Sequence, residues 1–347
     1  MERDVASAMK SEFDEQLEER LDRLCKPPGS LGDLELLARR LCATQRTLSP
    51  ATKPRRTVIF AADHGVTCEG VSAWPSEVTA SVVQMMQRSR TASGVFARAL
   101  QSEYEVVDVG LIRPIDKGPM NGRLIHASQR AGTGNLLHQA AMSTTDFDHS
   151  WDVGRSRAAS ANQDGCRLVI GGEMGVGNTT SASCLIGLFT EIDSDRIVGR
   201  GAGIDDTGLA RKREVVRSAI KRVKTLGKVD AKRMGCEVGG LEIVALAGFY
   251  AHAAELGLTI VLDGFIATAA AILAEAIRPT TCDQMIAGHR SSEPGHVMAL
   301  SHLGLTPLLD LNLRLGEASG ALVALPLIDL AAAMINQMAT LDDLIFP

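Results

Sequence analysis

The feature that most constrains the fold is a series of short apolar runs that each end in glycine. They read TVIFAADHG from Thr57, YEVVDVG from Tyr104, RLVIGG from Arg167 and LTIVLDG from Leu258. Runs of this length and composition are typical of strands buried on both faces of a parallel sheet. Parallel neighbours need long crossover connections, so the series predicts an α/β protein.

Alanine-rich stretches of helical periodicity lie between these runs. The clearest cover Thr79–Leu100, Thr179–Phe189, Arg211–Lys224 and Ala267–Ile277. The alternation predicts a doubly wound, mostly parallel, Rossmann-like sheet with helices on both faces. Ligands of such sheets bind at the carboxyl ends of the strands, and the polar segments of this chain follow the predicted strands directly.

The two ends of the chain have a purely helical pattern. Residues 10–24 and 33–48 carry apolar side chains at helical spacing, and the prolines of the segment KPPGSLG at 26–32 separate the two helices. Residues 318–341 are also helical in pattern. We therefore expect a smaller helical domain built from both termini. The expected division is 1–54 for the N-terminal part of the small domain, 55–310 for a large α/β substrate-binding domain, and 311–347 for a C-terminal segment with a glycine-rich loop and the last small-domain helix.

Composition narrows the class of ligand and the location. Aromatic residues make up 3% of the chain, and the net charge is −5 with both signs interspersed. Nucleic acid would find neither stacking platforms nor a broad basic face, so small ligands are favoured. The charged start lacks the apolar core of a signal peptide, and no later run is expected to span a bilayer, which predicts a cytoplasmic protein. The seven cysteines form no C-x-x-C pair and are interpreted as small buried side chains.

The strongest local signal is the loop GGEMGVGNTT at 171–180, between a predicted strand and a predicted helix. Free backbone N–H groups and the positive end of the helix dipole favour an anion such as phosphate there, beside Gly175, Asn178 and Thr179. The loop is neither a Walker motif nor G-x-G-x-x-G, which disfavours ATP hydrolysis and dinucleotide binding. A tight left-handed turn with a capping threonine is the structural alternative.

A second glycine-rich loop, GRGAGIDDTG at 199–208, contains Gly201 and Gly203 and precedes a helix with three basic residues. One of them, Lys212, is enough to hold a phosphate. The alternative is that Asp205 or Asp206 only caps the helix while the basic side chains face water.

A third segment, GHRSSEPGH at 288–296, offers the hydroxyls of Ser291 and Ser292 in a turn-rich stretch. Its histidines, His289 and His296, could also join the Asp63-His64 pair around a divalent metal ion. The histidine spacings do not place two rings on one helix face, as an i, i+4 pair would, and this disfavours the metal site.

The fourth segment is RLGEASG at 314–320, after the strand-like run LTPLLDLNL and before an apolar helix. Glu317 lies at the expected helix N-terminus, where a carboxylate is commonly only a favourable partner of the helix dipole. The glycines on both sides instead indicate that a ligand approaches the backbone closely.

Taken together, these segments resemble one known family. KPPGSLG, AADHGV at 61–66, GEMGVGNTT, LDGF at 262–265 and RLGEASGA occur in the order and spacing of the nicotinate-nucleotide:dimethylbenzimidazole phosphoribosyltransferases, from about residue 20 to about residue 335. Each motif alone is weak, but the set is specific.

The resemblance implies a glycosyltransferase of cobalamin biosynthesis. Nicotinate mononucleotide would give its ribose 5-phosphate to 5,6-dimethylbenzimidazole, yielding nicotinate and α-ribazole 5'-phosphate. No metal and no organic cofactor is implied. The resemblance also implies a homodimer whose subunits combine a Rossmann-like large domain with a helical small domain.

Residue roles follow from the same resemblance. Glu317 falls on the catalytic glutamate, and Glu173 on a second glutamate near the ribose or a developing positive charge. The expected phosphate and ribose contacts are Gly175, Asn178, Thr179, Gly201, Gly203, Lys212, Ser291 and Ser292. The expected base-binding residues are Trp74, Val82 and Leu315. Trp74 and Val82 replace a serine and a glutamine of some relatives, so the natural acceptor base stays open.

The expected chemistry needs a general base. One ring nitrogen of dimethylbenzimidazole attacks the ribose while the other must lose a proton, and a carboxylate in reach can take it. Two other functions fit the sequence less well. They are a metal-dependent phosphohydrolase that uses Asp63, His64, His289 and His296, and a non-catalytic nucleotide-binding regulator.

Overall fold

The computed structural model describes residues 12–115 and 123–344, and these form two compact units. The larger unit comprises residues 53–325, and the smaller unit combines 1–52 with 326–347. Residues 311–325, which the sequence analysis grouped with the C-terminal segment, belong to the large unit. One reason is that Asp263 Oδ1 accepts hydrogen bonds from the backbone N–H groups of Gly320, at 2.8 Å, and Ala321, at 3.0 Å.

The large unit is built on a sheet of six strands in the order β3-β2-β1-β4-β5-β6. Every neighbouring pair is parallel. The strands are β1 (Arg55–Ala62), β2 (Glu103–Gly110), β3 (Arg123–His126), β4 (Leu168–Met174), β5 (Thr259–Leu262) and β6 (Met285–Ala287). The strand order reverses between β1 and β4, which is the topological switch point of a doubly wound sheet. The predicted Rossmann-like fold is confirmed.

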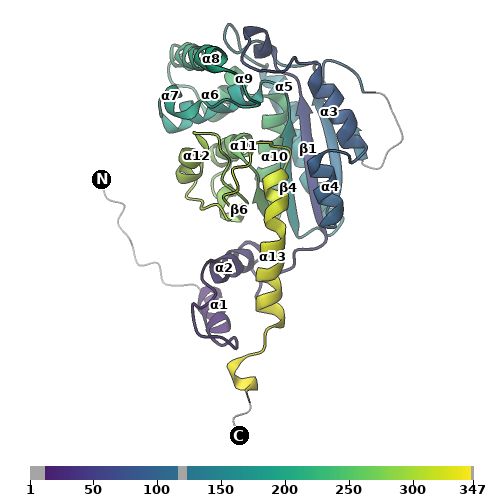
Figure 1. Cartoon of the computed structure of the whole chain (residues 1–347), viewed down its shortest axis with the longest axis vertical. Coiled ribbons are helices and arrows are strands. Elements are labelled where there is room, and N and C mark those ends of the chain that lie inside the picture. The colour runs from purple at the N-terminus through teal and green to yellow at the C-terminus, as the bar shows by residue number, and fades with distance from the viewer. Residues whose placement is uncertain (1–11, 116–122, 345–347) are drawn as a thin grey trace. The chain divides into compact units, whose positions relative to one another are not determined.

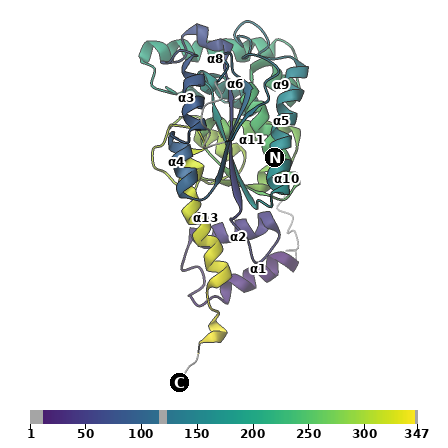
Figure 2. The same ribbon diagram turned by 90° about the vertical axis from the view of Figure 1, so that its right-hand side faces the viewer.

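Helices cover both faces of this sheet (Figure 1). Figure 2 shows α3 (Val78–Gln87) and α4 (Ala92–Ala99) on one face, and α5 (Thr144–Gln163) and α10 (Leu241–Glu255) on the other. The remaining helices of the large unit are α6 (Asn178–Thr190), α7 (Ser194–Ile197), α8 (Asp206–Lys224), α9 (Ala231–Val238), α11 (Phe265–Ile277), α12 (His296–His302) and the first residues of α13 (Ser319–Gln337), with short 3₁₀ turns η1 (Gly65–Glu69) and η2 (Thr281–Gln284).

Helices α5 and α10 pack unusually closely, and glycine makes this possible. A Cβ atom on Gly154 of α5 would overlap the carbonyl oxygen of Ala245 in α10. A Cβ atom on Gly248 of α10 would likewise overlap the carbonyl oxygen of Trp151 in α5. The backbones therefore touch at two crossing points, and α10 is buried almost throughout its length.

Two sequence predictions of local structure were wrong. The single helix expected over Thr79–Leu100 is interrupted, because Ser89 adopts a left-handed conformation with φ of 51° and Thr91 caps a new helix by accepting from Gly94 N–H. The run LTPLLDLNL forms no strand. It makes one isolated bridge, between His289 and Leu309, and otherwise follows the loop after β6. Strands β3 and β6 were not predicted, since β3 is partly exposed and β6 has only three residues.

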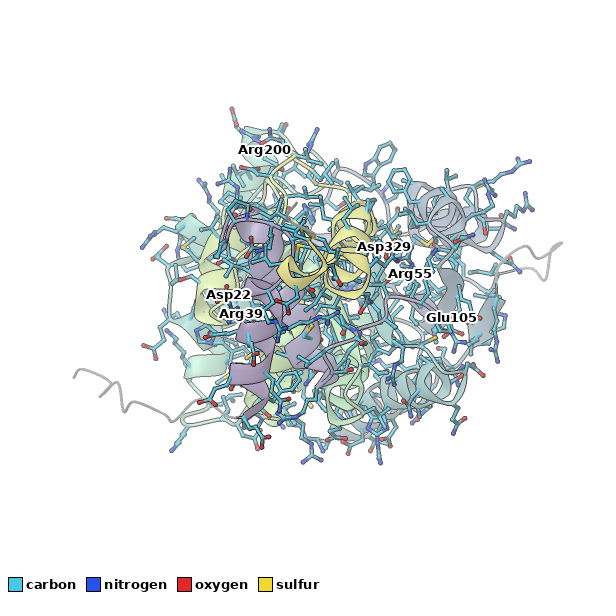
Figure 3. All side chains as sticks on the ribbon, turned by 90° about the horizontal axis from the view of Figure 1, so that it is seen from below. Asp22, Arg39, Arg55, Glu105, Arg200 and Asp329 are labelled. Carbon is cyan, nitrogen blue, oxygen red and sulfur yellow. The ribbon has the colours of Figure 1, made fainter. Side chains whose placement is uncertain are left out.

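The small unit is helical, as expected. Its helices α1 (Glu12–Asp22) and α2 (Asp33–Gln45) are joined where Arg39 Nη1 donates to Glu18 Oε1 at 2.7 Å, and Arg39 is labelled in Figure 3. Lys26 Nζ of the KPPGSLG loop and Glu35 Oε1 of α2 form a buried ion pair at 2.9 Å. The later residues of α13 and the turn η3 (Leu341–Asp343) complete the unit.

Helix α13 is long and apolar enough to be a candidate membrane span. By length and composition, Ser319–Gln337 could cross a bilayer, contrary to the expectation that no run of the chain would do so. However, 61% of this stretch is buried inside the protein. Burial of that kind is found in the core helices of soluble proteins.

Candidate active site

A cavity of about 430 Å³ lies at the carboxyl ends of β4, β5 and β6. Its walls come from the loops after these strands, from the loop before α8, from residues around α3 and from the turn before α13. The predicted site residues that line it are Trp74, Val82, Glu173, Gly175, Asn178, Thr179, Gly201, Ser291, Leu315 and Glu317. Segments far apart in the sequence thus meet at the edge where parallel strands place a ligand.

Three predicted residues do not line the cavity. Gly203 and Ser292 are exposed, and Ser292 contributes a backbone N–H to the carbonyl of Leu313. Lys212 is buried behind the wall, where its Nζ donates to Thr179 Oγ1 at 2.8 Å and to the carbonyl oxygen of Gly199 at 3.3 Å.

Glu317 sits in a strained turn at the start of α13. Both Glu317 and Ala318 have left-handed backbones, with φ of 59° and 63°, after Gly316 with φ of 84°. Such conformations are costly for residues other than glycine and tend to occur at functional sites. The turn is held by tight packing, since a Cβ on Gly172 of β4 would lie 2.7 Å from the backbone nitrogen of Ala318.

Burial controls the ionisation of Glu317. Burial raises its pKa against the opposing hydrogen bond from Ser93 Oγ at 3.3 Å, and with the smaller effect of the negative charge of Asp263 the pKa rises from 4.5 to about 7. A carboxyl group with this pKa exchanges a proton readily near neutral pH, as a general base must.

Glu173, at the end of β4, is the second carboxyl group of the cavity. Burial, followed by the charges of Asp263 and Glu242, raises the pKa of Glu173 well above its usual value. Asn178 Nδ2 donates a hydrogen bond to Glu173 Oε2. The turn of Glu317 approaches Glu173 closely, because a Cβ on Gly316 would lie 2.5 Å from Glu173 Oε1. A cation beside Glu173 would stabilise its ionised form.

Asp263, directly after β5, behaves differently. Burial alone would raise its pKa, but His289 and the backbone N–H groups of Ala321 and Gly320 outweigh that effect and lower it. His289 Nε2 lies 3.6 Å from Asp263 Oδ1. Asp263 therefore stays ionised, anchors the N-terminus of α13 and so holds the turn that carries Glu317.

The opposite part of the site suits an anion. Burial lowers the pKa of Lys212 to about 8, while the charge of Glu293 raises it. Lys212 lies behind Thr179 and Gly201, and both of these line the cavity. Arg200, labelled in Figure 3, also lines it and pairs with Asp206. The N-terminus of α6, which no side chain caps, adds the positive end of its helix dipole at Gly177.

Apolar side chains form the remaining wall. Trp74 and Leu315 line the cavity and are each 56% exposed, which is unusual for such large apolar groups. Val82 lies beside them, together with residues that the sequence analysis did not single out as base contacts: Val71, Val78, Phe265 and Ile266. A flat aromatic ring would bury this surface.

The residues of the expected metal alternative do not converge. His64 Nε2 is 2.6 Å from Glu242 Oε1, and Asp63 accepts from Ser76 Oγ and Ile112 N–H. His296 shares a hydrogen bond with Thr268 and accepts one from the Ser291 N–H, and burial lowers its pKa to about 3. Among the described residues, no group of three or more His, Cys, Asp or Glu could hold a metal ion.

Sequence reasoning missed several residues of this site. Asp263 and Phe265 were noticed only within the LDGF motif, although an acidic residue directly after a buried strand is itself a signal. Glu293, whose Oε1 accepts the Gly201 N–H at 2.8 Å, was part of a quoted segment without a role. Ser93 gave no signal, because 224 residues separate it from Glu317.

Comparisons with known proteins agree with this geometry. A family model described as phosphoribosyltransferase (DBI_PRT) matches residues 6–344. The chain is 47% identical over 322 residues to the nicotinate-nucleotide–dimethylbenzimidazole phosphoribosyltransferase of Chromobacterium violaceum, covering 92% of each chain. It is 43% identical to the enzyme of that name from Thermus thermophilus, covering 93% of this chain and 95% of the relative.

A solved structure is equally similar. The crystal structure of CobT from Thermus thermophilus superposes with a TM-score of 0.91 at 41% identity, covering 96% of this chain and 98% of that one. The match therefore extends over the sheet, the cavity loops and the helical ends. The chain belongs to the nicotinate-nucleotide–dimethylbenzimidazole phosphoribosyltransferase family.

Proposed function

We propose that this protein transfers the ribose 5-phosphate of nicotinate mononucleotide to 5,6-dimethylbenzimidazole, releasing nicotinate and forming α-ribazole 5'-phosphate. The observation that carries the proposal is the position of Glu317. This buried carboxyl group, with a pKa of about 7, shares one cavity with an apolar wall and with the loop over Lys212. Family membership supports the same reaction.

Glu317 acts as the general base. Dimethylbenzimidazole lies against Trp74, Val82 and Leu315, and one of its ring nitrogens attacks the ribose C1'. The other nitrogen gives its proton to the Glu317 carboxylate. The C1'–N bond to nicotinate breaks, and the bonding electrons neutralise the pyridinium ring, so no acid has to protonate the leaving group. Attack from the face opposite to nicotinate converts a β-linked nucleotide into an α-linked one.

Glu173 and the phosphate loops position the donor nucleotide. The pyridinium of nicotinate mononucleotide and the positive charge that develops on the ribose favour the ionised form of Glu173, which is otherwise disfavoured by burial. The phosphate binds between the N-terminus of α6 and the loop at Gly201, where Lys212 supplies a buried positive charge. Gly175, Asn178, Thr179 and Ser291 line this part of the cavity.

The first test is turnover with defined substrates. Purified protein is incubated with nicotinate mononucleotide and dimethylbenzimidazole in the presence of a chelator, and both products are followed by chromatography and mass. Formation of nicotinate and α-ribazole 5'-phosphate in equal amounts is expected. Nicotinate release without the coupled nucleotide would indicate hydrolysis, and binding without turnover would favour a regulator.

The base assignment has its own test. Glu317→Gln is expected to lower kcat by about 10² to 10⁴, because the carboxylate that accepts the proton is lost. In the unsubstituted protein, kcat/KM should fall as the pH drops below about 7, where Glu317 becomes protonated. A Glu317→Gln protein that folds normally and keeps full turnover would exclude Glu317 as the base.

The proposal includes assembly and location. The family resemblance implies a homodimer, and the sequence pattern separately predicts the cytoplasm. Sedimentation of the purified protein at micromolar concentration measures the assembly, and a monomer there would remove this part of the proposal without affecting the reaction.

A further inference from the structure

A chain of two hydroxyl groups leads from Glu317 to residues that do not line the substrate cavity. Ser93 Oγ donates to Glu317 Oε2 at 3.3 Å, and Ser93 is completely buried. Ser93 Oγ is also 2.9 Å from the Tyr104 hydroxyl, and either group can be the donor. Neither Ser93 nor Tyr104 lines the substrate cavity.

The chain ends at a second cavity. Tyr104 is one of its lining residues, with Ser89, Gly94, Arg98 and Ser102, and its volume is about 330 Å³. This second cavity is open to solvent and shares no lining residue with the substrate cavity. Two hydroxyl groups therefore link Glu317 to a residue of this second cavity.

The interruption between α3 and α4 creates this arrangement. The left-handed Ser89 ends the first helix, and Gly94 packs against it so closely that a Cβ on Gly94 would lie 2.7 Å from the Ser89 Cα. Helix α4 thus begins at Ala92, and its second residue is Ser93, next to Thr91 Oγ1 at 3.0 Å. The contacts of Ser93 Oγ with Glu317 and Tyr104 thus occur in the first turn of a separate helix.

We propose that Ser93 and Tyr104 are positioning residues that relay the proton from Glu317 to solvent through the second cavity. The inference rests on the proposed role of Glu317 as base. After Glu317 has taken the proton from the ring nitrogen, its carboxylic O–H donates to Ser93 Oγ. Ser93 passes its own proton to the Tyr104 oxygen, and Tyr104 passes its own to water in the second cavity. One proton enters and one leaves, and each hydroxyl stays neutral.

The chemistry of Tyr104 suits this role. Burial, and to a smaller extent the charge of Glu317, raises the pKa of Tyr104 to about 12, although hydrogen bonds with Ser93 and Thr91 oppose this. The hydroxyl therefore keeps its proton at neutral pH and works as a neutral link rather than as a competing acid. The relay restores the Glu317 carboxylate while product still fills the substrate cavity.

Tyr104→Phe tests the relay, because it keeps the ring and removes the last hydroxyl. At pH 8 the enzyme starts with Glu317 ionised, so the first turnover, measured by rapid quench, should keep its wild-type rate. Steady-state kcat should fall several-fold while kcat/KM stays unchanged, since only the recovery of the base is slowed. Ser93→Ala breaks the chain at its middle and provides a second variant if Tyr104→Phe does not fold. Ser102→Ala, which alters the same cavity without touching the chain, is the matched control and should leave both rates unchanged.

Other results would overturn the relay. Unchanged kcat in folded Tyr104→Phe and Ser93→Ala proteins would mean that Glu317 loses its proton through the substrate cavity. An equal loss in the first turnover and in steady state would mean that the hydroxyls only hold Glu317 in place. Failure of the proposed function looks different, because then the unsubstituted protein makes no α-ribazole 5'-phosphate, or Glu317→Gln keeps the full first-turnover rate.

Discussion

Lys212 and Glu317 share an energetic property, since burial disfavours the charged form of each side chain. The pKa of Lys212 is lowered to about 8, and that of Glu317 is raised to about 7. Groups of this kind are costly to the fold unless a ligand supplies the missing partner. In the proposed function that partner is the phosphate of the donor nucleotide for Lys212, and the N–H of the acceptor base for Glu317.

Lys212→Met separates binding from stability. In the proposed function, the variant should raise the KM for nicotinate mononucleotide about ten- to hundredfold, as expected for the loss of the buried positive charge behind the phosphate loops. Its free energy of unfolding at pH 7 should be unchanged or higher, because the cost of burying the ammonium group, which lowers the pKa of Lys212 to about 8, is removed with it. Lys224→Met, at the exposed end of the same helix, is the control and should change neither quantity. An unchanged KM in Lys212→Met would remove Lys212 from the phosphate site.

At the scale of elements, helices α5 and α10 pack closely against each other on one face of the sheet (Figure 2). The contact between α5 and α10 depends on Gly154 and Gly248, so these two glycines allow close helix packing and do not form turns.

Gly154→Ala should lower the free energy of unfolding by about 1 to 3 kcal/mol, because the helices must move apart to admit the methyl group. Denaturant titration measures this. Ser156→Ala, on the exposed side of α5, should be neutral or slightly stabilising, and equal stability of both variants would contradict the packing argument.

Most strands of the sheet could be predicted from the sequence alone. The strands starting near Thr57, Tyr104, Arg167 and Leu258 were predicted because their apolar runs are long and continuous. The three-residue β6 and the interruption at Ser89 were missed, since they depend on tertiary contacts that local pattern does not encode.

In the candidate site, too, local patterns were predictable and tertiary contacts were not. Segments of the cavity were predictable, because glycine-rich loops follow predicted strands and parallel topology gathers them at one edge. Individual partners were not predictable. The hydrogen bond from Ser93 to Glu317 joins residues 224 positions apart, and the ionisation of both glutamates depends on burial that only the folded chain creates.

For the molecule as a whole, the site makes stability depend on pH. Glu317 has a pKa of about 7 in the folded chain and near 4.5 in the unfolded chain, so between these values the folded state binds more protons. The contribution of Glu317 to the free energy of unfolding therefore falls as the pH rises from about 4.5 to about 7, whereas His296, whose pKa burial lowers to about 3, contributes a rise with pH from about 3 to about 6.5. Lys212 acts outside this window, because its lowered pKa of about 8 makes stability rise only above that pH.

Glu317→Gln isolates this contribution, because glutamine stays neutral at every pH while filling nearly the same volume. Below about pH 4.5 the two proteins should unfold with similar free energies. As the pH rises towards 7, the free energy of unfolding of the variant should increasingly exceed that of the unsubstituted protein. The difference should level off above about pH 7, at about 3 kcal/mol. Thermal unfolding of both proteins at a series of pH values measures the difference, in which groups that do not interact with Glu317, such as His296 and Lys212, cancel. Two curves that run parallel from pH 4.5 to 8 would show that Glu317 carries no burial cost, and then neither its raised pKa nor its role as a base near neutral pH could stand.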